Sequence, residues 1–302
     1  MREIGRRLAS AGPGLLWIAL LHLAPLSASA IAWHALLGPR TRLPLRTFVW
    51  ARWIAESINQ LLPALQLGGN LVRARLVARR GVPAPLAGAS VVVDITLHLL
   101  AQLVFTLLGV GLLLLLVGGP PLAGAVIAGL LVAVATVAAF YLVQRRGVFG
   151  AMARALARVV RSPDWASLSS RAKAMDACID GLYRERRDIG VSGAWHVLSW
   201  LLGASEIWLA LRLLGHPVSI ATAVVIESLG EALRTAAFVV PGALGVQEGG
   251  FVVLGSVFGF GPDLSIALSL TKRLRELCLG VPGLIAWQLE TASGAARARA
   301  ER

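Results

Sequence analysis

The chain is poor in charged residues, in cysteine and in lysine. Only 15% of its 302 residues are charged, whereas 57% are hydrophobic; an ordinary soluble domain has roughly 25% and 45–50%. Apolar runs of about twenty residues recur along the whole sequence, which excludes a soluble globular fold and intrinsic disorder. We therefore predict an all-α fold, a polytopic bundle of transmembrane helices.

The two cysteines, the motifs that are absent and the net charge exclude further classes of protein. Cys178 lies in a polar stretch and Cys278 in an apolar run, so they fit neither a shared disulfide nor a metal-binding spacing. No phosphate-binding loop, nucleophile elbow or zinc motif is present, and we expect no metal, no cofactor and no catalytic residue. The net charge of +13 comes from 27 arginines and two lysines. Such a surplus marks cytoplasmic flanks in a membrane protein, and without a soluble basic domain no nucleic-acid partner is expected.

Hydropathy predicts seven apolar spans. They cover residues 14–37, 45–62, 86–117, 120–143, 191–214, 219–240 and 263–289. The first span contains Ala28-Ser29-Ala30, which resembles a signal-peptidase site. Its apolar run nevertheless continues to Leu37, long enough to cross a core of about 30 Å at about 1.5 Å per residue. We predict a retained helix, with a cleaved signal as the alternative.

The spans divide the chain into four parts. These are a first transmembrane half (1–143), a basic linker (144–190), a second transmembrane half (191–290) and a basic tail (291–302). A shift of 178 residues without gaps places Trp17 on Trp195, Pro39 on Pro217, Pro63 on Pro241 and Gly81 on Gly259. We predict an internal repeat; the alternative is chance agreement between two glycine-rich halves.

The linker is basic and amphipathic. Apolar residues at spacings of three and four form helical stripes over 149–159 and 165–182. A basic amphipathic helix beside a membrane lies in the headgroup plane, where this one either connects the two halves or docks an anionic lipid or a partner. Basic residues place the N-terminus and the linker on the cytoplasmic side of the membrane. Arg40, Arg42 and Arg46 conflict with that topology, and the side of the C-terminus stays open.

Two shorter apolar segments are broken by proline and glycine, one in each half. The predicted hinges are Pro63, Gly68, Gly69, Pro241, Gly242 and Gly245. Non-helical backbone at membrane depth survives only where it is buried in protein or lines a cavity. Paired interruptions in two halves are typical of the binding site of a transporter. We therefore predict two re-entrant or broken helices at a central cavity.

Charged side chains also lie within or beside the apolar spans. Twelve are present: Arg52, Glu56, Asp94, Glu206, Glu227, Glu231, Arg234, Glu248, Lys272, Arg273, Arg275 and Glu276. Each costs about 2.5–3.5 kcal/mol at the centre of a membrane, so they must face one another, water or a substrate. Helical spacing groups several of them on shared faces and allows local pairs, such as Arg273 with Glu276 and Glu231 with Arg234. For the set as a whole, a polar cavity is the better interpretation.

Several motifs resemble a known family. Asn59-Gln-Leu-Leu-Pro63, Gly68-Gly-Asn-Leu-Val-Arg73, Pro241-Gly-Ala-Leu-Gly-Val-Gln-Glu-Gly-Gly250 and Lys272-Arg-Leu-Arg-Glu276 are similar to motifs of the lysylphosphatidylglycerol synthase transmembrane (flippase-like) family. Glu56-Ser57, Val91-Val-Val-Asp94 and Glu227-Ser-Leu-Gly-Glu231 resemble its hopanoid-biosynthesis branch. The resemblance extends over about residues 10–290. One departure is Asn70, where the family's first motif has glutamate.

The resemblance implies lipid translocation or handling in the inner membrane of a hopanoid-making bacterium, and it carries over Arg73 and Glu248 as site residues. Together with the buried charges, it predicts a headgroup cavity lined by Glu248, Gln247, Asn70, Arg73, Asp94, Lys272 and Arg275. The expected ligand is a membrane lipid, either a hopanoid or a phospholipid. Aminoacyl transfer is carried in the family by a separate soluble domain, and we do not expect residues 1–302 to perform it.

Three functions follow, in order of preference. The first is a flippase-like protein without catalysis of its own. The second is an accessory subunit that presents lipid to a biosynthetic enzyme. The third is an intramembrane transferase that uses Glu248 or Asp94 as a general base.

Overall fold

The computed structural model describes residues 14–62, 68–118, 165–236 and 245–300, together with positions 12 and 142. Within these residues the regular elements are helices and there is no strand, which confirms the all-α prediction. The elements are α2 (Gly14–Leu37), η1 (Gly38–Arg40), α3 (Leu45–Leu61), α4 (Gly68–Ala78), α5 (Ala84–Val117), α8 (Trp165–Arg184), α9 (Arg186–Leu213), α10 (Ile220–Ala236), α11 (Val246–Val257) and α12 (Pro262–Ala300).

Three of the described helices are long and apolar enough to cross a membrane, namely α2, α5 and α9. The predicted spans at 45–62, 219–240 and 263–289 are the helices α3, α10 and α12. These three helices carry many of the buried charges, which lowers their hydropathy. The predicted span at 120–143 and the stripe at 149–159 lie outside the described residues.

The outer surface of the bundle exposes apolar side chains, whereas charged side chains lie in its interior. Leu107, Leu114 and Leu115 on the C-terminal half of α5 are exposed, Leu115 by 84%. Asp94, on the same helix, has no exposed surface. Leucine on the outside and carboxylate on the inside is the distribution that a lipid environment favours, because a charge facing hydrocarbon is expensive.

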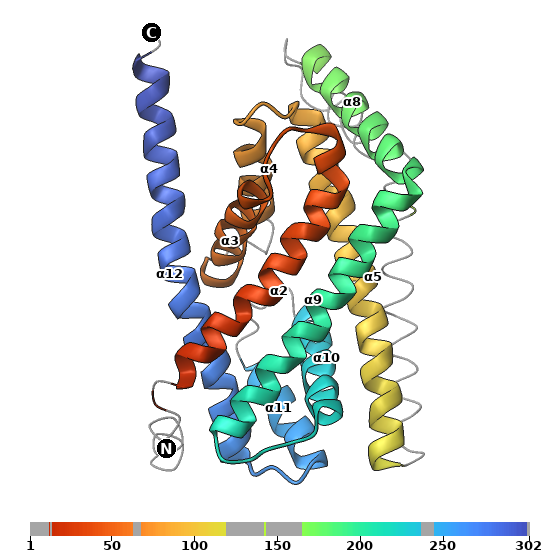
Figure 1. Ribbon diagram of the computed structural model, residues 1–302, viewed down its shortest axis with the longest axis vertical. Coiled ribbons are helices and arrows are strands. Elements are labelled where there is room, and N and C mark those ends of the chain that lie inside the picture. Colours follow the sequence, from red (N-terminus) through yellow and green to blue (C-terminus); the bar gives the residue numbers. More distant parts are fainter. Residues whose placement is uncertain are drawn as a thin grey trace.

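The two halves of the bundle are interleaved. In Figure 1, α5 and α12 lie on opposite sides, with α2 and α9 between them. The helix α2 packs along α9, while α3 of the first half contacts α12 and α10 of the second half contacts α5. The space between the halves is therefore walled by helices from both.

Helix boundaries recur at the offset of the proposed repeat. Gly68 begins α4 and Val246 begins α11, and these residues are 178 apart. Ala84 begins α5 and Pro262 begins α12, again 178 apart. The agreement is in keeping with a repeat, which stays a prediction.

The helix α8 occupies the linker and packs on the bundle. Ile179 and Leu182, from its predicted apolar stripe, are buried against Leu36 of α2 and against Val93 and Leu97 of α5. This part of the stripe therefore contacts protein. The helix α9 already begins at Arg186, and α12 continues through the predicted tail to Ala300.

Half of the predicted hinge residues can be placed. Gly68 and Gly69 begin α4, and the Gly69 N–H donates to the side-chain oxygen of Asn59 at 2.9 Å. A Cβ at Gly69 would lie 2.0 Å from the Ala55 carbonyl oxygen, so α4 and α3 meet there without room for a side chain. Gly245 precedes α11 with φ of +80°, a backbone conformation that favours glycine. Pro63, Pro241 and Gly242 lie outside the described residues, and the re-entrant course stays a prediction.

Candidate functional site

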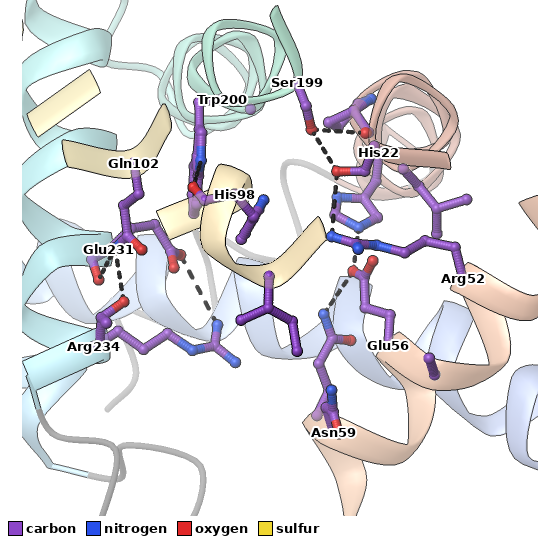
Figure 2. Close-up of a pocket in the computed structure, with 18 of the residues that line it drawn as sticks. His22, Arg52, Glu56, Asn59, His98, Gln102, Ser199, Trp200, Glu231 and Arg234 are labelled. Atoms are coloured by element: carbon purple, nitrogen blue, oxygen red, sulfur yellow. Dashed lines mark hydrogen bonds and ion pairs between the residues drawn. The ribbon is translucent and has the colours of Figure 1, made fainter. Parts of the chain in front are cut away.

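A polar cavity of about 390 Å³ lies at the centre of the bundle, within the range of small-molecule sites. Its walls come from α2, α3, α4, α5, α9, α10 and α12. The polar lining residues are His22, Ser29, Arg52, Glu56, Asn59, Gln60, Asn70, Arg73, His98, Gln102, Ser199, Glu206, Glu227, Glu231, Arg234, Thr235 and Arg275. Figure 2 shows His22, Arg52 and Glu56 on one side and Glu231 and Arg234 on the other.

The first ion cluster is centred on Asp94 of α5. Its carboxylate accepts hydrogen bonds from Arg73 at 2.5 Å and from Arg52 at 3.0 Å. His196 Nε2 lies 2.9 Å from the other carboxylate oxygen. Asp94, Arg73 and His196 are at most 1% exposed. Two guanidinium groups thus share one carboxylate, which leaves an excess of positive charge beside the cavity.

Arg73 is held from three sides. Besides Asp94, the side-chain oxygen of Asn70 accepts from Arg73 Nε at 3.0 Å. The guanidinium also lies 4.8 Å from the centre of the Trp33 ring, close enough for a cation–π contact. Trp33 is itself buried and donates to the Ser90 hydroxyl at 3.1 Å. These contacts fix the arginine in one orientation at the cavity wall.

The second ion cluster is centred on Lys272 of α12. Its ammonium donates to Glu227 at 2.8 Å and to Glu231 at 3.0 Å. Glu231 also lies 4.0 Å from Arg234. Here two carboxylates share one ammonium, the reverse of the arrangement around Asp94.

Neighbouring pairs extend this cluster along α12. Arg234 donates to Glu276 at 2.8 Å, and Arg273 donates to Glu276 at 3.2 Å. The predicted pairs Arg273–Glu276 and Glu231–Arg234 are thus both present, the second at the limit of ion-pair distance.

A third cluster surrounds His22 and joins the two halves. His22 Nε2 lies 2.6 Å from Glu56 on α3, and Nδ1 lies 2.8 Å from Glu206 on α9. Arg275 of α12 lies 2.5 Å from Nδ1 and donates to Glu206 at 2.9 Å. Glu56 also accepts from Gln60 at 2.8 Å. Four helices thus meet at one imidazole.

The predicted site residues fall into three groups. Asn70, Arg73 and Arg275 line the cavity. Asp94 and Lys272 are buried behind the wall, where they hold the lining residues in place.

The remaining two predicted residues, Gln247 and Glu248, lie in the first turn of α11 and are not among the lining residues of the described cavity. Glu248 accepts from the Gly245 N–H at 2.7 Å and from the Ser269 hydroxyl at 3.2 Å. This pattern caps the helix. The Gln247 side chain is 3% exposed, and its amide has no hydrogen-bond partner within the described part of the chain.

Several lining residues were not predicted as site residues. Arg52, Glu56, Glu206, Glu227, Glu231 and Arg234 belong to the twelve buried charges, so burial could have identified them. His22 was not singled out, although a histidine in the middle of an apolar run is a detectable signal. The 178-residue shift places His22 on Trp200, and both line the cavity.

The cavity offers side chains that bind ions and polar groups. Among the described residues, no group of three or more His, Cys, Asp or Glu side chains could hold a metal ion. What these residues provide is one end rich in arginine and one end where glutamates are paired with Lys272 and Arg234, surrounded by helices that expose apolar side chains on their outer faces.

Comparison with known proteins identifies the family. The family model described as "Lysylphosphatidylglycerol synthase TM region" matches residues 1–283. No curated protein and no solved structure matches the chain. The family resemblance is thereby confirmed, whereas its hopanoid branch stays a prediction.

Proposed function

Because this chain belongs to the lysylphosphatidylglycerol synthase transmembrane-region family and is an integral membrane protein, we propose that its cavity binds the headgroup of an amphiphilic lipid and carries it between leaflets. The ligand is a hopanoid or a phospholipid of a bacterial inner membrane. The N-terminus and the linker lie on the cytoplasmic side. The chain performs no catalysis of its own.

The observation that supports this proposal is the difference in charge between the two ends of the cavity. Arg52 and Arg73 outnumber Asp94 at one end. At the other end, Glu227, Glu231 and Glu276 are balanced by Lys272, Arg234 and Arg273. An anionic part of the headgroup, such as a phosphate, is stabilised beside the arginines. A hydroxyl or a cationic group is stabilised beside the glutamates. A headgroup that extends across the cavity meets both ends.

The surroundings favour a lipid over a freely soluble ligand. The cavity lies between α2, α5 and α9, the helices that are apolar enough to cross a membrane. An amphiphile places its polar group in such a cavity while its tails stay in hydrocarbon, so neither part is desolvated without compensation.

The proposal is tested by a leaflet-accessibility assay in proteoliposomes with labelled phospholipid and hopanoid probes. Wild-type protein is compared with Arg52→Gln, which removes a cavity charge, and with Arg80→Gln, which removes a charge paired with Glu290 away from the cavity. We expect Arg52→Gln to slow lipid movement about tenfold or more, the value of one charged hydrogen bond, and Arg80→Gln to move lipid at the wild-type rate.

Other outcomes contradict the proposal in identifiable ways. Equal rates for wild type and Arg52→Gln would mean that lipid does not pass through the cavity. Lipid that is bound but never moved would favour the accessory subunit, and a probe of changed mass would favour the transferase.

A further inference from the structure

The His22 side chain is surrounded by charged groups from three other helices. Glu56 on α3 faces Nε2 at 2.6 Å, and Glu206 on α9 faces Nδ1 at 2.8 Å. Arg275 on α12 faces the same Nδ1 atom at 2.5 Å. The fourth long helix packed against α2 is α5, whose nearby titratable groups Asp94 and His98 contact His196 rather than His22.

The partners of Nδ1 require opposite protonation states. A neutral imidazole has one N–H donor and one acceptor, whereas an imidazolium has two donors. Glu206 and Glu56 together accept from both ring nitrogens only if His22 is protonated. Arg275 has N–H groups and no acceptor, so it bonds to Nδ1 only if that nitrogen carries a lone pair and His22 is neutral.

We propose that His22 is a proton-binding site, and that binding or release of one proton there is coupled to headgroup binding in the cavity. In the protonated state, Nδ1–H donates to Glu206 and Nε2–H donates to Glu56. In the neutral state, Nε2–H still donates to Glu56, while one N–H of Arg275 Nη1 donates to Nδ1 and the other keeps its bond to Glu206. Each state has a complete set of partners, so His22 stays bonded between the two halves in both.

The proton transfer follows from the same contacts. The N–H bond at Nδ1 breaks, and its proton passes to the Glu206 carboxylate oxygen that lies 2.8 Å away. Because Glu206 lines the cavity, it then passes the proton to a water molecule in the cavity. The reverse sequence reloads His22.

Coupling follows from the charge of the cluster. With His22 protonated, the charges of His22, Arg275, Glu56 and Glu206 cancel. After proton release the cluster carries one negative charge, which is unfavourable inside a membrane without a counter-charge. A cationic group in the cavity replaces the lost proton, and a bound proton disfavours that group. Two ligands that affect the same site in this way are reciprocally linked. This coupling rests on the proposed function, whereas the proton site rests on the geometry of His22 alone.

The proton site is tested first, without any lipid movement. Purified full-length protein in nanodiscs carries ¹⁵N-labelled histidine, and its imidazole nitrogens are followed by NMR between about pH 5 and pH 9, a window around the ordinary histidine range. The chain has five histidines, and the His22 signals are those lost in His22→Gln. Glutamine keeps one donor and one acceptor, so this variant mimics the neutral state. We expect His22 to change from two N–H groups to one as pH rises. A His22 that holds a single state over the whole range overturns the proposal.

The coupling is tested by lipid movement with and without an imposed pH gradient. We expect the gradient to change the wild-type rate by about fivefold or more, at the low end of ordinary coupling. We expect His22→Gln to lose this response. The matched control is His216→Gln, because His216 packs on Phe260 and is not among the cavity residues; it should respond like wild type.

The outcomes separate the two proposals. If lipid moves and the gradient has no effect on any variant, the coupling is wrong and the lipid function stands. If His22→Gln responds like wild type, His22 is not the coupling site. If no lipid moves under any condition, the proposed function fails, and the NMR titration alone decides whether His22 binds a proton.

Discussion

The central buried charge of the first half is negative, whereas that of the second half is positive. Asp94 on α5 and Lys272 on α12 lie 178 residues apart, the offset that aligns the halves. Asp94 is one carboxylate between Arg52 and Arg73, whereas Lys272 is one ammonium between two glutamates. The same arrangement, one central charge with two opposite partners, is present in both.

The difference shows what the clusters are suited to do. A cluster that served stability alone would be neutral, because an uncompensated charge in a low-dielectric interior is costly. The Asp94 cluster instead carries a positive excess, whereas the Lys272 cluster is balanced once Arg234, Arg273 and Glu276 are included. The positive excess lies beside the cavity, where an anionic headgroup can satisfy it.

The largest expected effect comes from Asp94→Asn. This change leaves the buried Arg73 and the partly buried Arg52 without their shared counter-charge, and arginine does not lose its proton. We expect a loss of about 3–5 kcal/mol of stability, the usual cost of breaking a buried pair. Thermal unfolding in detergent measures it, with Asp263→Asn on the exposed first turn of α12 as the control. A loss of under about 1 kcal/mol would contradict the role given to Asp94.

Lys272→Met removes the central positive charge of the second cluster. It leaves Glu227 without its cation and Glu231 with Arg234 alone, at 4.0 Å. Carboxylates, however, become neutral by taking up protons, whereas guanidinium groups do not become neutral by losing them. The destabilisation should therefore be smaller than for Asp94→Asn and should shrink as pH falls, because acid removes the repulsion. Unfolding temperatures of both variants at about pH 5 and pH 8 check this, since the window covers the onset of carboxylate protonation in buried sites. If both variants show the same pH dependence, the predicted contrast between the Asp94 and Lys272 clusters is wrong.

Glu248→Gln separates helix capping from lipid binding. Glu248 accepts from the Gly245 N–H and the Ser269 hydroxyl at the start of α11. We expect a loss of about 1 kcal/mol, as for other helix caps, with lipid movement retained. Abolished lipid movement in a folded variant would instead place Glu248 in the binding site, as the family motif implies.

Arg80→Gln should have the smallest effect. The Arg80–Glu290 pair is 2.7 Å long, comparable with the buried pairs, but both side chains are about one third exposed. Exposed pairs contribute roughly 0–1 kcal/mol, so the unfolding temperature should hardly change. A loss as large as that of Asp94→Asn would show that burial is not what distinguishes the clusters.

The helices could be predicted from the sequence because hydropathy and the positions of proline residues indicate where they begin and end. The expected 45–62 and 86–117 correspond to α3 (Leu45–Leu61) and α5 (Ala84–Val117). Pro44 and Pro83 precede these helices, and proline suits such positions because it lacks an N–H. These signals are local, so one sequence is sufficient to detect them.

The contacts between helices could not be predicted in the same way. Helical spacing identifies neighbours three or four residues apart, and it found Arg273 with Glu276. Asp94, however, contacts Arg52 and His196, which are 42 and 102 residues away. Which faces meet depends on how α5 packs on α3 and α9, and hydropathy contains no information on that.

Photo-crosslinking is the measurement that tests the central claim most directly. Wild-type protein in proteoliposomes is irradiated with lipids that carry the photoreactive group in the headgroup, and the adducts are mapped by peptide mass spectrometry. We predict adducts on cavity residues such as Gln60 and Gln102, reduced in Arg52→Gln. Adducts confined to the exposed leucines of α5, such as Leu115, would contradict the claim, because the headgroup would then never have entered the cavity.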